Sequence, residues 1–263
     1  MQLTQLFVYP IKSAHGIAVA EAGLTARGLE HDRRFMLVDA DHNFLTQRQL
    51  PQMARLVPEI VGGALRVRWE QEQLEVPLTP RDGEPLRVRV WRDEVEALAL
   101  GPEASAFFSQ ALGQATRLVY LPDASARQVD LQYSAPGDHV SFADGFPYLL
   151  ANEASLADLN AQLAQPVPMS RFRPNLVIAG APAYAEDAWR EICIGDARFE
   201  VKKPCTRCAI ITTDQETGRR DGKEPLQTLV RTRSWQGKPV FAQNLLCRDG
   251  GRLRRGDAVT VVA

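Results

Sequence analysis

Two cysteines lie three positions apart in the segment Lys203-Pro204-Cys205-Thr206-Arg207-Cys208. Thiolates bind soft metals and exchange disulfides, whereas a cysteine without chemistry is among the most buried side chains. The arginine between the two thiols favours the ionised form of either one. The pair therefore allows a metal site, a redox disulfide or two packed core residues.

The surrounding sequence disfavours structural zinc and a thioredoxin-like disulfide. Structural zinc normally takes four nitrogen or sulfur ligands in two close pairs, but Cys193 and Cys247 are solitary and all four histidines precede residue 140. A thioredoxin-like pair lies where a strand leads into a helix, whereas residues 209–213 have the β-branched pattern of a strand. Packed thiols remain open, as does one thiolate bound to a redox metal whose other ligands belong to a cofactor. Because residues three apart in a strand face opposite sides, one cysteine would bind and the other would pack.

Cations and a hydroxyl elsewhere in the chain are candidates for the anion-binding part of such a cofactor site. Lys12 and Ser13 follow the first expected strand in a turn, where an ammonium and a hydroxyl could hold a phosphate. Arg34, Arg48 and Arg173 are further candidates, although each alone is more often a solvated cation. No Walker A or dinucleotide glycine pattern is present, which disfavours a nucleotide cradle of those types.

Composition and charge exclude several classes of function. The 263 residues carry a net charge of -1, which gives no long-range attraction for nucleic acid or acidic lipid. The first ten residues have the pattern of a strand rather than of a signal peptide, and no apolar run approaches the roughly 20 residues that span a bilayer. Four cysteines are too few for a disulfide scaffold. We therefore expect a cytoplasmic protein that binds neither nucleic acid nor membrane.

Periodicity predicts a mainly β chain with some α-helix. Alternating apolar and polar residues, or short β-branched runs, predict strands at 34–38, 65–69, 74–77, 86–91, 117–120, 175–178, 198–202, 209–213 and 259–262. Helical spacing predicts helices at 102–112, at 152–163 with Asn152 as its cap, and from Pro225 onward. A polar stretch at 125–138 has no periodicity and is expected to be a loop.

Eight segments, taken in order, resemble the MOSC family, the domain at the C-terminus of molybdenum cofactor sulfurases, preceded by its N-terminal β-barrel partner. Within that family the similarity is to the amidoxime-reducing components of mitochondria and their bacterial counterparts. The segments that carry it are 9–13 (YPIKS), 32–35 (DRRF), 144–147 (DGFP), 153–160 (EASLADLN), 172–175 (FRPN), 185–189 (AEDAW), 205–208 (CTRC) and 223–226 (KEPL). The resemblance implies an N-terminal β-barrel domain at 1–120 and a MOSC β-barrel with peripheral helices at 121–263.

The resemblance also implies a set of site residues. The second cysteine, Cys208, would bind molybdenum, and Cys205 would become a packing or supporting residue. An acid near the metal falls on Asp144, which would assist proton delivery; the Thr-Ser that follows it in some family members is replaced by Gly145-Phe146. Contacts to a pyranopterin and its phosphate fall on Lys12, Ser13, Arg34, Arg173, Asn175 and Thr206.

The function that the resemblance implies is the reduction of N-hydroxylated compounds, such as hydroxylamines and amidoximes, by oxygen-atom abstraction at a molybdenum–pyranopterin cofactor. No ferredoxin-like segment follows the last expected strand. Electrons would then come from a separate flavin, haem or iron–sulfur protein. The alternative is a module that binds the molybdenum cofactor, or carries sulfur, during cofactor maturation.

Overall fold

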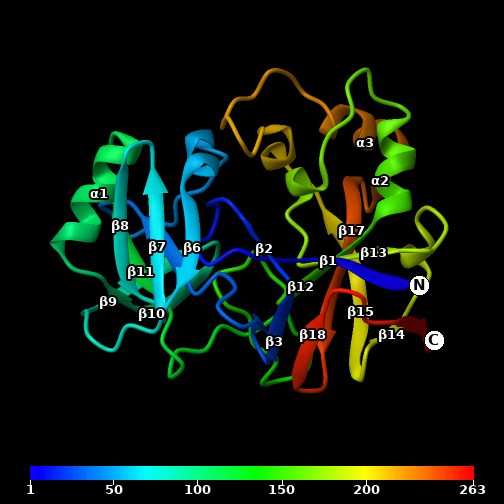
Figure 1. Cartoon of the computed structure of the whole chain (residues 1–263), viewed down its shortest axis with the longest axis horizontal. Helices are drawn as coiled ribbons and strands as arrows, with labels where there is room; N and C mark the ends of the chain where they lie inside the picture. The colour runs from blue at the N-terminus through cyan, green and yellow to red at the C-terminus, as the bar shows by residue number, and fades with distance from the viewer.

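The computed structural model describes residues 1–263 as two β-rich halves that lie side by side (Figure 1). The first half carries α1 (Pro102–Leu112) on its outer side, and the second carries α2 (Glu153–Asn160) and α3 (Leu226–Thr232) near one end (Figure 1). None of the helices combines the length and the apolar composition needed to cross a bilayer. The predicted fold class, mainly β with some α, is confirmed.

The first half contains a four-stranded sheet and a three-stranded sheet, with two clusters of buried apolar side chains. The four-stranded sheet has the order β5-β11-β10-β9, with β5 at Phe35–Val38, β9 at Glu84–Val90, β10 at Asp93–Ala99 and β11 at Arg117–Tyr120. The three-stranded sheet joins β6 (Val57–Val61), β7 (Ala64–Trp69) and β8 (Glu72–Pro77). Burial alternates along β7, β8 and β9, as their sequences predict. The inward residues of β7 and β8 pack with Phe35 and with Phe108 of α1, whereas those of β9 pack in a second cluster with Met36 and Phe142.

The second half contains a nine-stranded sheet in the order β19-β14-β15-β17-β12-β13-β1-β2, with β16 paired to β17. Its strands are β1 (Gln2–Val8), β2 (Ile17–Val19), β12 (Tyr148–Asn152), β13 (Leu176–Ala179), β14 (Glu191–Ile194), β15 (Ala197–Thr206), β16 (Ser234–Trp235), β17 (Lys238–Cys247) and β19 (Val259–Val261). The one parallel pair, β12 with β13, is connected through α2. The core side chains include Leu6, Leu176, Ile192, Phe199 and Leu245.

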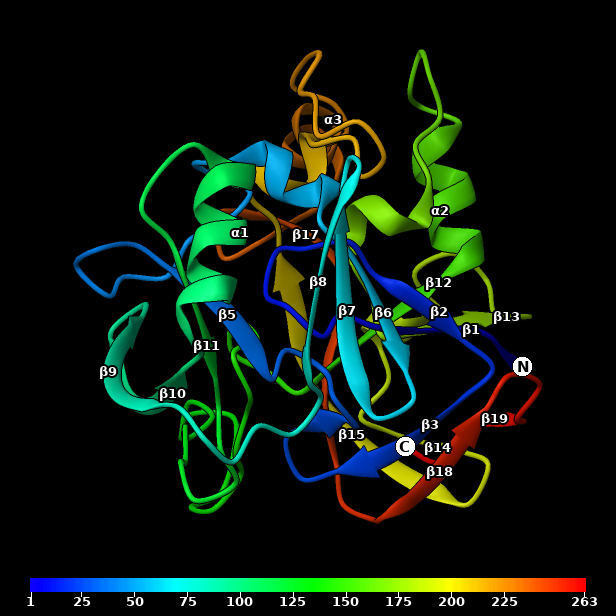
Figure 2. The ribbon, with the colours of Figure 1, turned by 60° about the vertical axis from the view of Figure 1, so that its left-hand side comes forward.

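The start of the chain pairs with the second half rather than the first. Strand β1 lies antiparallel to β13. Strand β3 (Glu21–Thr25) lies between β4 (Gly28–Leu29) and β18 (Gly251–Arg254), and Figure 2 shows β3 beside β18. Strand pairing therefore joins residues on both sides of the expected domain boundary between residues 120 and 121. That boundary stays a prediction.

Most expected elements are found, but two features of the second half differ. Helix α1 has its predicted bounds, and the side chain of Asn152 accepts a hydrogen bond from the Ala154 N–H at the start of α2. The strand expected at 209–213 is wrong: residues 209–212 form a short 3-10 helix, in which Thr212 Oγ1 donates to the Ala209 carbonyl. The other 3-10 segments are Pro51–Arg55, Met169–Phe172 and Ala185–Asp187.

Strand β17 is central to the sheet and was not predicted. Its residues 240–243 are buried without a break because β15 and β12 flank it and its two faces are covered. A strand buried on both faces loses the period-two alternation by which strands are identified in a sequence.

Candidate functional site

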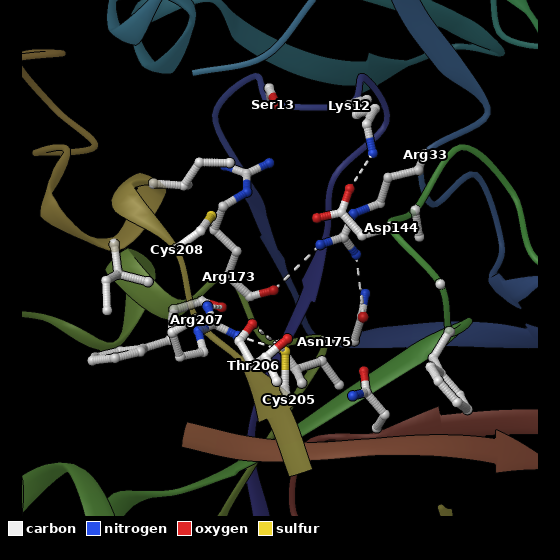
Figure 3. Close-up of a pocket in the computed structure, with 18 residues that line it drawn as sticks. Lys12, Ser13, Arg33, Asp144, Arg173, Asn175, Cys205, Thr206, Arg207 and Cys208 are labelled. Carbon is white, nitrogen blue, oxygen red and sulfur yellow. Dashed lines mark hydrogen bonds and ion pairs between the residues drawn. The ribbon is translucent and has the colours of Figure 1, made fainter. Parts of the chain in front are cut away.

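A cavity of about 130 Å³ lies where the two halves meet, and it shares much of its wall with an outer groove of about 1000 Å³. Five segments supply most of the lining: the turn after β1, the turn before β5 with Arg33, the loop before β12, residues 172–175, and the chain from the end of β15 to Ile211 (Figure 3). The side chains with chemistry are Lys12, Ser13, Arg33, Asp144, Arg173, Asn175, Cys205, Thr206, Arg207 and Cys208. Residues more than 190 positions apart in the sequence thus share one wall.

Both cysteines of the pair line this cavity. Strand β15 has an irregular register between Pro204 and Thr206 and ends there, so that Cys208 begins the 3-10 turn instead of continuing the strand. The simple alternation of a strand does not apply across a bulge, and the expectation that the two cysteines face opposite sides is wrong. Both are free, partly buried thiols. The Arg207 guanidinium donates a hydrogen bond of 2.9 Å to Cys205 Sγ.

Arg173 is the buried cation of the cavity. Its backbone has φ 55°, its guanidinium lies 4.4 Å from the centre of the Tyr9 ring, and Nη1 donates to Gln215 Oε1 at 3.1 Å. Its other terminal nitrogen, Nη2, is buried without any hydrogen-bond partner. Burial lowers the pKa of Arg173 to about 10. A buried, unpaired donor of this kind is costly in an empty cavity and suited to an anionic ligand.

Arg33, and not Arg34, lines the cavity, so the prediction for Arg34 is wrong. The Arg33 guanidinium lies 4.1 Å from the Tyr9 ring centre and pairs with buried Asp32 at 2.6 Å. Arg34 projects away and bonds to the Leu121 carbonyl and to Asp123. Arg33 adopts φ 48° in a turn, and adjacent side chains along an extended chain point in opposite directions.

Lys12 and Asp144 form an ion pair at one side of the cavity. Lys12 Nζ lies 2.5 Å from Asp144 Oδ1 and also donates to the Phe142 carbonyl. Burial lowers the pKa of Lys12 to about 8, although Asp144 raises it. Burial raises the pKa of Asp144, but the Lys12 ammonium and its hydrogen bond, with the Arg48 guanidinium, hold that pKa below its ordinary value. At neutral pH the exchangeable proton of this pair therefore lies on the lysine.

The remaining expected residues, Ser13, Thr206 and Asn175, differ in whether their side chains already form hydrogen bonds within the protein. Ser13 is buried with φ 66° and lines the cavity, and Thr206 lines it with an exposed side chain. The amide of Asn175 is engaged: Nδ2 donates to the Phe7 carbonyl and to Asp32, and Oδ1 accepts from Arg33. Asn175 thus holds the acid and the arginine in place while it lines the wall.

Three residues at this site were not singled out in the sequence: Arg33, Arg127 and Trp91. Arg127 lies in the predicted loop, is buried, and donates to the carbonyls of Ser141 and Asp144 while its Nε bonds to Asp93 at 2.8 Å. It therefore fixes the backbone that carries Asp144. A single arginine in a polar stretch gives no sequence signal for such a role.

The side chains of the cavity fit an anionic, sulfur-ligating group better than a bare metal ion. The structure has no cluster of three or more His, Cys, Asp or Glu side chains that could hold a metal ion alone, so a metal here would need ligands from a cofactor. Four cations and one acid line the cavity, and the free Arg173 Nη2 adds an unused donor. The Cys208 thiol, a soft donor group, lies on the same wall.

Comparison with known domains identifies both halves. Residues 1–115 match the MOSC N-terminal beta barrel domain, and residues 137–260 match the MOSC domain. The resemblance inferred from eight short segments is therefore confirmed.

Full-length relatives cover nearly the whole chain. Mitochondrial amidoxime-reducing component 1 of Mus musculus is 36% identical over 98% of this chain and 81% of its own length. The Homo sapiens component 1 is 34% identical over 98% and 82%. Mitochondrial amidoxime reducing component 2 of Rattus norvegicus is 32% identical over the same shares. This chain belongs to the MOSC-domain family that includes these proteins.

Proposed function

We propose that this protein is a molybdenum-cofactor-dependent reductase of small N-hydroxylated compounds. The observation that carries the proposal is the thiol of Cys208 on the wall of a cavity whose cations outnumber its acids and whose Arg173 Nη2 has no partner. The names of the relatives, which are amidoxime-reducing components, support the substrate class.

The chain's own residues would divide the work of holding the cofactor. Cys208 would be the protein ligand to molybdenum, whereas Arg173, Lys12 and Arg33 would neutralise the anionic end of the pterin through charge-assisted hydrogen bonds. Ser13, Asn175 and Thr206 would complete that wall. When bound, the molybdenum pterin supplies the two-electron redox chemistry, and the protein positions it and excludes competing reactions.

The overall reaction is balanced by two electrons and two protons: R–NH–OH becomes R–NH2 and water as the N–O bond breaks. A separate electron-transfer protein would supply the electrons. Lys12 Nζ holds a proton beside Asp144, and a pKa of about 8 lets it exchange that proton near neutral pH. Asp144, as an ionised acceptor, would orient the substrate N–H or O–H. This assigns Asp144 a positioning task and leaves the proton to the lysine and to water.

The test is made on protein from a host that synthesises the cofactor, by molybdenum and pterin analysis alongside turnover of an aryl amidoxime with an artificial electron donor. Cys208→Ala should lose nearly all molybdenum, whereas Cys205→Ala should keep most of it. Equal loss in both variants would overturn the ligand assignment. If the wild type held cofactor without turning over any N-hydroxylated compound, but delivered it to an apo-enzyme, the reductase proposal would fail in favour of a carrier.

A further inference from the structure

Trp91 lies at the rim of the candidate site in a backbone conformation that disfavours a bulky side chain. Trp91 and Arg92 form the two-residue turn between β9 and β10, in which Val90 pairs with Asp93. Trp91 has φ 58° and is 44% exposed. Positive φ in such a turn is normally supplied by glycine or asparagine, and a bulky residue there is strained. The large exposed ring gains little from core packing, so its presence calls for another explanation.

The Trp91 ring is held toward the site by three contacts. Its Nε1 donates to Asp144 Oδ1 at 3.3 Å. The Arg48 guanidinium lies 4.3 Å from a ring centre of the indole, and the Phe44 ring lies 5.0 Å away. All four residues line the outer groove, and Asp144 also lines the inner cavity. Trp91 therefore forms a fixed aromatic wall at the entrance.

The groove beyond this wall is positively charged. Its lining includes the cations Arg48, Arg92, Arg127, Lys203, Arg207 and Lys238, against the acids Asp93, Asp130 and Asp144. Asp93 pairs with Arg127, and Asp144 pairs with Lys12. Asp130 pairs with Arg92 at 3.8 Å. The groove cations that form no salt bridge are Lys203, Arg207 and Lys238, so the charges left over after pairing are positive.

We propose that this groove selects aromatic N-hydroxylated substrates that carry an anionic group, with Trp91 as the stacking surface and Lys238 as an anion contact. The inference rests on the proposed function for the N-hydroxyl group, which would reach past Asp144 into the inner cavity. A flat ring would lie against the exposed indole, and a carboxylate or phosphate on its far side would meet the free ammonium. The strained turn is then explained by substrate recognition.

The kinetic test uses three amidoximes: acetamidoxime, benzamidoxime and 4-carboxybenzamidoxime. Trp91→Gly suits the turn and should fold normally. It should raise KM for the two aryl substrates about tenfold more than for acetamidoxime, which has no ring to stack. Lys238→Gln should lower the preference for the carboxylated over the uncharged aryl substrate about fivefold. Trp69→Leu is the matched control, because Trp69 lies in β7 under the Arg55 guanidinium, 4.7 Å away, and does not line the groove.

A second arm separates this inference from the proposed function. Binding of 4-amidinobenzoate, which cannot be reduced further, is measured by calorimetry on the same proteins. Affinity lost in Trp91→Gly and kept in Trp69→Leu supports the groove even if no amidoxime is turned over. Equal affinity in those two variants, or a wild type that does not distinguish the carboxylated from the uncharged ring, would overturn the inference.

Discussion

Replacing Arg173 by methionine should weaken anion binding without destabilising the cofactor-free protein. Arg173 is 9% exposed, has no carboxylate partner within the cavity, and leaves Nη2 without a hydrogen bond. Its guanidinium is therefore arranged for a ligand rather than for the fold. Methionine keeps most of the apolar length of the side chain and removes the charge.

The magnitude follows from the pKa of Arg173. Burial lowers it from 12.5 to about 10, which corresponds to about 3 kcal/mol of unfavourable free energy for the charged form. Removing the side chain also loses one hydrogen bond to Gln215, of about 1 kcal/mol, and a cation–π contact with Tyr9, of about 1–2 kcal/mol. These contributions nearly cancel. We expect the free energy of unfolding to stay within about 1 kcal/mol of the wild type.

Arg171→Met is the matched control. Arg171 lies two positions earlier, in the 3-10 segment Met169–Phe172 that Arg173 follows, but its guanidinium pairs with Asp214 at 3.2 Å and donates to the Thr212 carbonyl at 2.8 Å. It does not line the cavity. Its removal leaves a carboxylate without its cation and should lower the free energy of unfolding by about 2 kcal/mol, while anion affinity stays the same.

The assay is urea unfolding of cofactor-free protein, together with calorimetric titration of inorganic phosphate at constant ionic strength. A bound ligand stabilises the native state in proportion to the logarithm of its concentration above Kd. Phosphate should therefore raise the midpoint of the wild type and of Arg171→Met, but not of Arg173→Met. If Arg173→Met lost as much stability as Arg171→Met and bound phosphate normally, Arg173 would be a structural residue and the reasoning would be refuted.

Two further predictions concern Lys12 and Arg127. Burial lowers the pKa of Lys12 to about 8, and only the protonated ammonium attracts an anion. Phosphate affinity should therefore fall as pH rises from 7.5 to 9.5, by up to about tenfold per pH unit. A Lys12→Met variant whose phosphate affinity fell equally with pH would contradict this. Arg127→Met removes the cation from Asp93 and a donor from the Asp144 carbonyl. It should lower the free energy of unfolding by about 3 kcal/mol or more, with partial rescue by lysine, and a loss below about 1 kcal/mol in urea unfolding would be the contrary result.

Local periodicity predicted the elements that are buried on one face. Strands β7, β8 and β9 alternate buried and exposed residues, so their sequences carry their structure. Strand β17 is covered on both faces and shows no alternation. Residues 209–212 have β-branched side chains but close a 3-10 turn, since β15 ends in an irregular register at Thr206. Propensity was overridden there by the tertiary position of the segment.

The sequence predicted most of the residues that line the site, but not how their side chains are oriented. Seven of the eight expected side chains line one cavity, but the choice between Arg33 and Arg34 depends on a backbone φ of 48° that two adjacent arginines do not reveal. Trp91 gave no signal either, because it lies in a turn between two strands of the other half. Residues brought to a site by the meeting of two halves have no fixed spacing in the sequence.

The pairing of β1 with β13 explains how residues of the two halves come together at the cavity. Because β1 is an inner strand of the second sheet, the turn that follows it carries Lys12 and Ser13 directly to the cavity. The chain then leaves the second half to build the first. Gln47 of the first half and Gln215 of the second are both buried, and their side-chain amides exchange two hydrogen bonds of 3.0 Å. Gln215 is also the acceptor for Arg173. The buried cation is thus oriented by a contact that exists only when both halves are folded together, so the anion site depends on the junction and not on either half alone.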